Sequence, residues 1–447
     1  MPIPAIGLAA AAGLLFFGYA FARWITLQSS AFDLAYFDQV VWNASQGHGF
    51  TSSFVPYPFF GQHFSPALAL LVPLYWIHPS PLWLLGAQSV ALGAAIVPLY
   101  LFARTLLSHR AALIACAVYA AQPFVIRAVG YDFHTEALAV PFVFGAVLGA
   151  ARMSRSGDVA VVLAGSAPML CKEDGALVSL GIGFLALAVF RRRAGLVLSA
   201  VALAYGLVVT TVVMPAIRDG QAGDLVSRYS YLGSSVPQIL LGLVLHPQVA
   251  ALHILSPGPL GAVALMLGAG AFLPLARPLA LAAALPSMVF ELLSAHLQQA
   301  TLLDQYGLQP GPLVFVAAIL GWVRISPALG AWPRRVAAIR FAPALLAASV
   351  TVLLLAAPVP GLGSLESGRG AIALASVVPP DASVAASSGL ATMLAERPSI
   401  AVLPAHEQEW LAVDGSAETA EFISGLPRRG YVEVGRWGAM SLWRHQA

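Results

Sequence analysis

The chain has 447 residues, of which 59% are hydrophobic and 10% are charged, and its formal net charge is +3. Because soluble domains carry about 25% charged residues, this composition excludes a soluble globular protein and indicates an integral membrane protein. The small net charge gives no reason to expect a nucleic-acid partner. The two cysteines, Cys116 and Cys171, lie in apolar segments and predict no disulfide framework.

About eleven uncharged apolar runs are long enough, or nearly long enough, to cross a bilayer as helices. They cover residues 4–22, 81–103, 111–126, 137–151, 159–171, 175–190, 194–217, 257–276, 278–290, 305–323 and 341–360. The first run lacks the basic flank of a secretory signal, so we expect a retained helix. Segment 64–77 is short and contains Pro66 and Pro73, so we expect it to be re-entrant or interfacial.

Arginines set the predicted orientation of these helices. If the N-terminus is cytoplasmic and segment 64–77 does not cross, most basic residues before position 360 lie in cytoplasmic turns, as the positive-inside rule requires. The C-terminal part of the chain is then outside. Most acidic residues before position 360 also fall on the outer side, which suggests a shared polar cavity at the outer leaflet. The alternative is that the outer loops happen to be acidic and share no cavity.

The first outer loop, residues 28–80, carries Asp33 and Asp38 just past the first apolar run. Five residues apart on a helix, they would lie on neighbouring faces, so each could approach a different part of one ligand. The same loop holds further hydrogen-bonding side chains, among them Gln39, Trp42, Asn43, His48, Gln62 and His63. A loop that merely connects two helices would not need them. The alternative is that Asp33 and Asp38 are simply solvated acids of a loop.

The loop at 130–136 is very short, so Asp132, His134 and Glu136 must lie close to the membrane surface. Two acids and a histidine at alternate positions could bind a divalent cation. They could equally hold a basic, phosphate-binding residue in place.

Lys172, Glu173 and Asp174 lie between two short apolar runs and are followed by Gly175. Such a polar break is typical of the discontinuous helices that form substrate sites within membranes. Lys172 would then offer its ammonium group to a phosphate, with Glu173 or Asp174 holding it. An ordinary tight outer hairpin is the alternative.

Two later outer segments add polar side chains to the same side. Residues 218–256 include Arg228 and are interrupted by His246-Pro247, so we expect interfacial helices there. The loop 291–306 ends in Tyr306 and could line the same cavity or be plain loop.

The composition changes after position 360, and shorter alternating stretches appear. We divide the chain into a transmembrane part, residues 1–360, and a small extracytoplasmic α/β domain, residues 361–447. Within the second part the pattern predicts strands at 383–387, 399–403 and 431–434 and helices at 388–396 and 416–425.

These motifs together resemble a bacterial membrane family of unassigned function, domain of unknown function 2079. The resemblance covers nearly the whole chain and rests on Phe32-Asp33-Leu34-Ala35-Tyr36-Phe37-Asp38-Gln39, Trp42-Asn43, Gly61-Gln62-His63-Phe64-Ser65-Pro66, Asp132-Phe133-His134, Lys172-Glu173-Asp174 and Tyr306. It implies a multi-pass protein of the bacterial cytoplasmic membrane.

Asp33, followed by Ala35-Tyr36 and later by Gly47-His48-Gly49-Phe50, also resembles the first outer loop of GT-C glycosyltransferases. In that superfamily an acid directly after the first span is the usual catalytic position, and the donor is a polyprenyl-phosphate sugar. The resemblance therefore implies a GT-C-like helical fold with Asp33 as the catalytic acid. The companion acid usual at the next position is Leu34 here, which leaves Asp38 as its substitute.

The sequence thus predicts a membrane glycosyltransferase-like protein that uses a polyprenyl-phosphate sugar at the outer face. Asp33 and Asp38 are the catalytic candidates. The candidates for binding substrate and phosphate are Gln39, Trp42, His63, Asp132, His134, Glu136, Lys172, Glu173, Asp174, Arg228 and Tyr306. A transporter or flippase, in which the same charges would move a lipid-linked or small solute, and a non-catalytic envelope-assembly protein are the alternatives. The need for a metal stays open.

Overall fold

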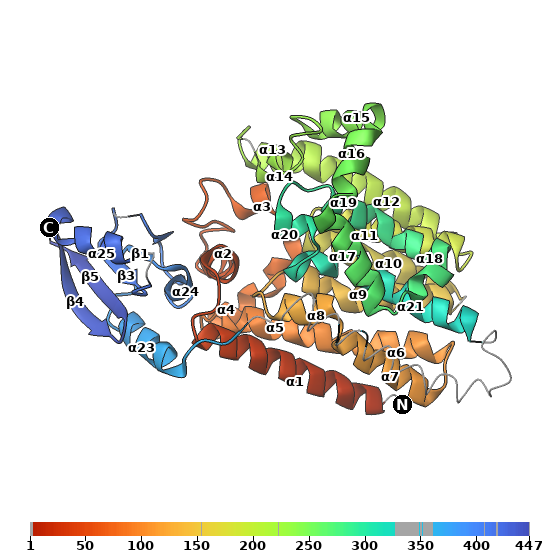
Figure 1. Cartoon of the computed structure of the whole chain (residues 1–447), viewed down its shortest axis with the longest axis horizontal. Helices are drawn as coiled ribbons and strands as arrows, with labels where there is room; N and C mark the ends of the chain where they lie inside the picture. The colour runs from red at the N-terminus through yellow and green to blue at the C-terminus, as the bar shows by residue number, and fades with distance from the viewer. Residues whose placement is uncertain are drawn as a thin grey trace.

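The computed structural model describes residues 3–152, 154–221, 223–326, 361–405, 407–416 and 419–446, together with the single residues 348 and 351. Most of the described chain is helical, and one small sheet lies near the C-terminus (Figure 1). The sheet lies beyond the C-terminal end of helix α1 (Ile3–Ile25), whereas the N-terminus of α1 points to the opposite end of the bundle.

The first half of the chain forms helices α1 to α12, with a π-helical turn (Ala31–Ala35) after α1. Their bounds are α2 (Tyr36–Ser45), α3 (Phe59–Gln62), α4 (Val72–Ile77), α5 (Leu82–Ala94), α6 (Ile96–Arg104), α7 (His109–Ala120), α8 (Pro123–Val129), α9 (Glu136–Ala151), α10 (Arg155–Cys171), α11 (Gly175–Ala188) and α12 (Ala194–Val208).

The second half adds helices α13 to α21 and the C-terminal elements. Their bounds are α13 (Met214–Ile217), α14 (Asp224–Ser227), α15 (Val236–Leu245), α16 (Pro247–Ile254), α17 (Pro257–Ala269), α18 (Pro278–Leu281), α19 (Leu285–Leu292), α20 (Leu297–Ala300), α21 (Gly311–Ile325), α23 (Leu365–Ala375), β1 (Val384–Ala386), α24 (Ser388–Ala391), β2 (Ile400–Val402), β3 (Trp410–Val413), α25 (Ala420–Gly425), β4 (Tyr431–Trp437) and β5 (Met440–His445).

Among the described residues, 3 helices are long and apolar enough to cross a membrane, and the count rises to 6 if each of three bent helix pairs is one span. The long helices are Ile3–Ile25, Leu82–Arg104 and Ala194–Ile217, and the bent pairs are His109–Ala120 with Pro123–Val129, Val236–Leu245 with Pro247–Ile254, and Leu297–Leu308 with Gly311–Ile325. Shorter apolar helices pack among them, such as Glu136–Ala151 and Gly175–Ala188.

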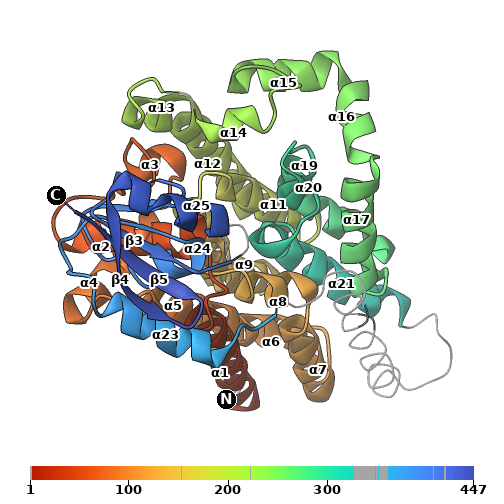
Figure 2. The same ribbon diagram turned by 60° about the vertical axis from the view of Figure 1, so that its left-hand side comes forward.

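The predicted apolar runs are mostly helical where the structure describes them. Three of them are bent or interrupted: α7 and α8 meet at 46°, the chain bends by 73° before α21, and the run 257–276 breaks after α17, where Ala271 and Phe272 adopt positive φ. The predicted interfacial segment 218–256 contains the helices α14, α15 and α16. α15 and α16 stand away from the bundle with a bend of 91° between them (Figure 2). The predicted span 341–360 lies outside the described residues, apart from single positions.

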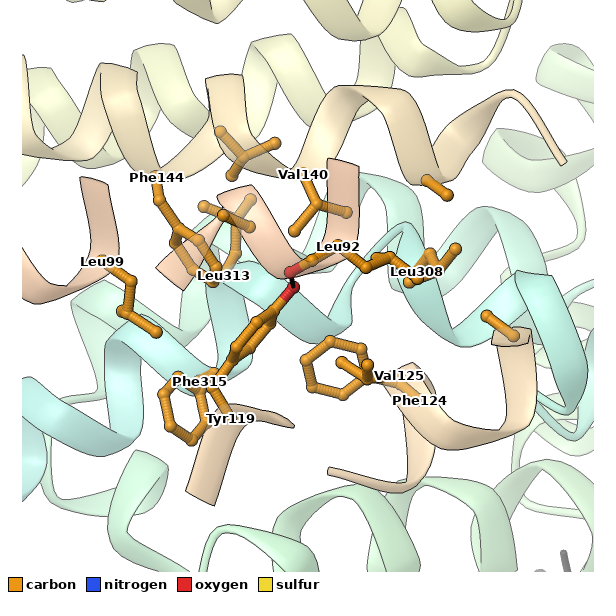
Figure 3. Packing of buried hydrophobic residues seen from close by; sticks show 14 of the residues in the cluster. Leu92, Leu99, Tyr119, Phe124, Val125, Val140, Phe144, Leu308, Leu313 and Phe315 are labelled. Atoms are coloured by element: carbon orange, nitrogen blue, oxygen red, sulfur yellow. Dashed lines mark hydrogen bonds between the residues drawn. The ribbon is translucent and has the colours of Figure 1, made fainter. Parts of the chain in front are cut away.

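Apolar side chains of distant helices fill the centre of the bundle (Figure 3). Tyr119 of α7 packs edge-on against Phe144 of α9, with ring centroids 5.3 Å apart, and lies 6.1 Å from the ring of Phe315 in α21. Its buried hydroxyl donates to the carbonyl of Leu92 at 3.1 Å. A buried hydroxyl without an acceptor would be destabilising, so this bond allows a tyrosine in an otherwise apolar core.

The C-terminal region, residues 361–446, contains a mixed five-stranded sheet in the order β2-β1-β3-β5-β4. β1 pairs in parallel with β2 and β3, whereas β5 pairs antiparallel with β3 and β4. β1, β2 and β4 lie where the sequence predicts strands. The strands β3 and β5 and the helix α23 were not predicted, and the two predicted helices are shorter than expected.

Candidate functional site

A polar cavity of about 320 Å³ lies where several loops meet. Its lining comes from the segment after α1, the loop between α8 and α9, the break between α10 and α11, the segment near Arg228 and the loop before α21. The lining residues are Ser30, Phe32, Asp33, Tyr36, Phe37, Phe54, Val55, Gln62, His63, Tyr131, His134, Thr135, Glu136, Lys172, Arg228, His296, Gln298, Gln305 and Tyr306. Each of these segments is an outer one in the predicted topology, and the tertiary structure brings them together.

Asp33 reaches the cavity from the π-helical turn. Its Oδ1 lies 3.3 Å from Nε2 of His134, and the ring of Tyr131 stacks on His134 with centroids 5.7 Å apart. Burial alone would raise the pKa of Asp33, but the hydrogen bond and charge of His134 outweigh burial and hold this pKa below its usual range. Burial lowers the pKa of His134, but Asp33 outweighs it and raises that pKa. The pair therefore favours an ionised Asp33 at the cavity wall.

Lys172 is the cation at the break between α10 and α11. Its Nζ lies 2.7 Å from Oε1 of Glu136 and 3.4 Å from Oδ2 of Asp174, and it lies 5.8 Å from the centre of the Tyr306 ring. The side chain is 12% exposed and lines the cavity. Of the two roles considered for Glu136, this geometry matches the one in which the acid holds a basic residue in place.

Arg228 supplies a second cation to the cavity. Its Nη1 donates to Oε1 of Gln299 at 2.8 Å and to the hydroxyl of Tyr306 at 3.2 Å. Tyr306 thus contacts Arg228 through its hydroxyl and approaches Lys172 with its ring. Both cations thus approach one aromatic side chain at the cavity wall, an arrangement that suits a ligand with several anionic oxygens.

The acids that follow Lys172 are not part of the cavity lining. Glu173 accepts the backbone N–H of Phe64 at 3.0 Å and lies 3.3 Å from Nδ1 of His63, which itself lines the cavity. Asp174 accepts a hydrogen bond from Gln309. A Cβ at Gly175 would lie 2.0 Å from the carbonyl oxygen of Pro168, so only glycine allows the chain to turn this tightly.

Four more predicted site residues lie outside the cavity lining. Asp38 is fully buried, and its Oδ1 accepts the hydroxyl of Tyr75 at 2.6 Å. Gln39 donates to the carbonyl of Arg397 at 3.0 Å, in the C-terminal region. Trp42 packs against the apolar core.

The fourth, Asp132, contacts Ser30, the residue just before the π-helical turn. Its Oδ2 accepts the backbone N–H of Ser30 at 2.7 Å, and burial raises its pKa to about 7. Asp132 adopts a positive φ of 89° in the short loop.

The two catalytic candidates have different surroundings. Asp33 lines the cavity, whereas Asp38 lies outside its lining and contacts Tyr75.

Several side chains that line the cavity were not among the predicted site residues, although Tyr36 and Gln62 belong to the motifs of the first outer loop. Tyr36 donates to Oε1 of Gln62 at 2.6 Å, and Tyr131 covers His134. Gln62 and Tyr131 lie next to predicted site residues in the chain, and that proximity was the available signal. In the part of the chain that the structure describes, no group of three or more His, Cys, Asp or Glu side chains is arranged to hold a metal ion.

Comparison with solved structures identifies the fold. The chain is similar to ArnT from Cupriavidus metallidurans, solved bound to undecaprenyl phosphate and in the apo state, with a TM-score of 0.53 and 15% identity over 97% of this chain and 98% of that chain. It also matches the oligosaccharyltransferase AglB from Archaeoglobus fulgidus, in complex with an inhibitory peptide and a dolichol-phosphate, with a TM-score of 0.47 and 13% identity over 98% of this chain and 74% of that chain.

The predicted fold class is thereby confirmed: the chain has a mostly helical, multi-span membrane fold like that of ArnT, with a small mixed sheet near the C-terminus. It thus resembles GT-C glycosyltransferases in fold. No curated protein matches the chain by sequence. The sequence model of one family, described as "Predicted membrane protein (DUF2079)", matches residues 23–428. The chain therefore belongs to this family of membrane proteins, as its motifs predicted.

Proposed function

We propose that this protein is a membrane glycosyltransferase that moves a sugar from a polyprenyl-phosphate donor to an acceptor at the outer face of the membrane. One observation carries the proposal: the carboxylate of Asp33 and two basic side chains, Lys172 and Arg228, line a single cavity. The similarity in fold to a transferase that was solved with undecaprenyl phosphate supports this choice of donor.

Each charged group has a task in such a transfer. Asp33 takes the proton from the acceptor as the acceptor atom forms its bond to the anomeric carbon of the sugar. The bond between that carbon and the donor phosphate oxygen breaks, and its electron pair leaves with the lipid phosphate. Lys172 and Arg228 stabilise the negative charge that develops on this phosphate. His134 holds Asp33 ionised and oriented.

The test uses the full-length protein in lipid nanodiscs and a panel of undecaprenyl-phosphate sugars, with transfer followed by mass spectrometry. Asp33→Asn keeps the shape of the side chain but removes its basicity, so the transfer rate should fall on the order of 10² to 10⁴. Binding of undecaprenyl phosphate should change little. Asp158→Asn is the matched control, because Asp158 lies at the start of α10, pairs with Arg192 and does not line the cavity.

Asp38→Asn separates the two catalytic candidates. Asp38 lies outside the cavity lining and contacts Tyr75, so this variant should transfer sugar faster than Asp33→Asn does. A folded Asp33→Asn protein that works at the wild-type rate, while Asp38→Asn is inactive, would move the base to Asp38. Movement of the lipid across the bilayer without any sugar transfer would instead favour a flippase.

A further inference from the structure

The turn that carries Asp33 lies between the cavity and the C-terminal region. Ala31 and Ala35 are fully buried and belong to an apolar cluster formed mostly by the C-terminal region, with Ala371 and Leu390 among its members. Asp33, between them in the chain, lines the cavity. The same short turn therefore presents its alanines to the C-terminal region and its carboxylate to the site.

Two neighbouring backbone amides at the start of this turn are held by side chains from different parts of the chain. Ser30 donates its N–H to Oδ2 of Asp132 at 2.7 Å, on the bundle side. Ala31 donates its N–H to Oγ of Ser388 at 2.9 Å, at the start of α24. The first N–H groups of a helical turn have no partner within the turn, so Asp132 and Ser388 satisfy two of them from opposite sides.

A second contact joins the C-terminal region to the loop 28–80, which also contains the π-helical turn. Oγ of Ser53 donates to the carbonyl of Ile400 at 2.6 Å and accepts the N–H of Ile400 at 2.9 Å. Ile400 begins β2, which is an edge strand of the sheet. The next residue in the chain, Phe54, lines the cavity. The C-terminal region thus contacts two separate stretches of the cavity wall.

The backbone of the C-terminal region also packs closely against the backbone at the C-terminal end of α1. A Cβ at Gly368 would lie 1.9 Å from the carbonyl oxygen of Ile25, and a Cβ at Gly389 would lie 2.6 Å from that of Leu27. Only glycine permits so close an approach of two backbones. Because this packing fixes α24 relative to α1, it also fixes the position of Ser388 at the π-helical turn.

We propose that Ser388 is a positioning residue through which the C-terminal region holds the π-helical turn and aims Asp33 at His134. π-Helical turns are less stable than α-helical ones and occur often at functional sites, so this turn needs support from outside. The catalytic meaning of the inference rests on the proposed function, whereas the positioning itself does not.

The experiment compares Ser388→Ala, which removes the acceptor, with Ser388→Thr, which keeps a hydroxyl. Ser424→Ala is the control, because Ser424 is an exposed serine whose hydroxyl donates to the carbonyl of Glu421 at the end of its own helix. Full-length protein in nanodiscs is studied by hydrogen exchange of the peptide that covers residues 28–38. The pKa of His134 is measured by NMR with labelled histidine. The Asp33→Asn variant provides the reference pKa of His134 in the absence of the Asp33 carboxylate.

In Ser388→Ala we expect the amides of residues 31–35 to exchange roughly threefold to tenfold faster, as loss of one hydrogen bond predicts. The pKa of His134 should fall toward the Asp33→Asn value, because Asp33 is no longer held against the ring. Ser388→Thr and Ser424→Ala should match the wild type in both measurements. The affinity for undecaprenyl phosphate should stay within about twofold, because Lys172 and Arg228 are untouched.

Unchanged exchange in Ser388→Ala would overturn the inference, since Ser388 would then not hold the turn. Faster exchange with an unchanged His134 pKa would also overturn it, because Ser388 would cap the turn without aiming Asp33. Both measurements are independent of sugar transfer. If no variant and no wild-type sample transfers sugar, the proposed function fails while the positioning role is still decided.

Discussion

Nζ of Lys172 lies 2.7 Å from Oε1 of Glu136, although the two residues belong to different breaks between helices. Glu136 begins α9, and Lys172 follows the last residue of α10. The pair therefore joins two polar interruptions of the bundle at one point of the cavity. It also fixes an ammonium group where it can meet an anionic ligand, because a paired lysine has fewer conformations to lose on binding.

Lys172→Met should weaken the binding of undecaprenyl phosphate about 10-fold to 100-fold, the usual effect of losing a charged hydrogen bond. Lys172→Arg keeps the charge and should lose less. Binding can be measured by native mass spectrometry or by lipid titration in nanodiscs. The control is Arg192→Met, which removes a cation that pairs with Asp158 rather than lining the cavity. Equal affinities for Lys172→Met and the wild type would exclude Lys172 from the phosphate site.

His134→Gln should move the acid limb of the pH–rate profile to higher pH. His134 lowers the pKa of Asp33 against the opposing effect of burial, so its removal lets that pKa rise, and Asp33 is then protonated at a higher pH. The expected displacement is roughly one to three pH units, the usual effect of a close opposite charge. His109→Gln is the control, since His109 contacts Tyr100 at the start of α7. An unmoved acid limb would argue that Asp33 is not the titrating base.

The packing of the C-terminal region on the loop 28–80 should become less stable as the pH rises from about 4.5 to about 7. Burial raises the pKa of Glu396 from 4.5 to about 7, and the charge of Arg397 opposes this rise. The pKa of Asp38 is also raised, mainly by burial and secondly by the charge of Glu396. The hydroxyl of Tyr75 donates to Asp38. The folded state binds more protons than the unfolded state in this range. Stability is therefore fully present below about pH 4.5 and is lost as the pH rises through the raised pKa.

The magnitude of this loss should be on the order of 1–3 kcal/mol. Hydrogen exchange of α24 at pH 5 and pH 8 measures it, with faster exchange expected at pH 8. Glu396→Gln cannot ionise, so its exchange, corrected for the intrinsic effect of pH, should depend less on pH. A wild-type protein that is more protected at pH 8 would contradict the assigned direction.

The orientation predicted from arginines can be tested with single cysteines. Ser424→Cys lies in the C-terminal region and Arg110→Cys in the first turn of α7, and both positions are exposed. The native Cys116 and Cys171 are buried and should give little background. A membrane-impermeant maleimide should label Ser424→Cys on intact cells and Arg110→Cys only after lysis. The reverse pattern would invert the topology.

Hydrophobic runs and motif residues were sufficient to predict much of this molecule. A helix that crosses lipid must be apolar over its length, so the runs locate helices wherever the chain is described. Lys172 and His134 stood out because charged side chains are rare near hydrocarbon, and both line the cavity. The strand β3 was missed because it is a short, fully buried apolar stretch without alternation, a pattern that does not separate strand from helix. The strand β5 also lacks alternation, since its first four residues are all buried and its last two are exposed.

The sequence by itself determined that Asp33 and Asp38 follow the first apolar run, but only the tertiary structure decided that they have different surroundings. A spacing of five residues predicts neighbouring faces if the helix is regular, yet Asp33 lies in a π-helical turn whose hydrogen bonds span one residue more than those of an α-helix. That turn changes the direction of every side chain relative to those that follow. The partners that fix it, Asp132 and Ser388, are 102 and 357 residues away from the amides that they hold. Such distant contacts depend on how the helices and the sheet pack, and local sequence patterns carry no information about them.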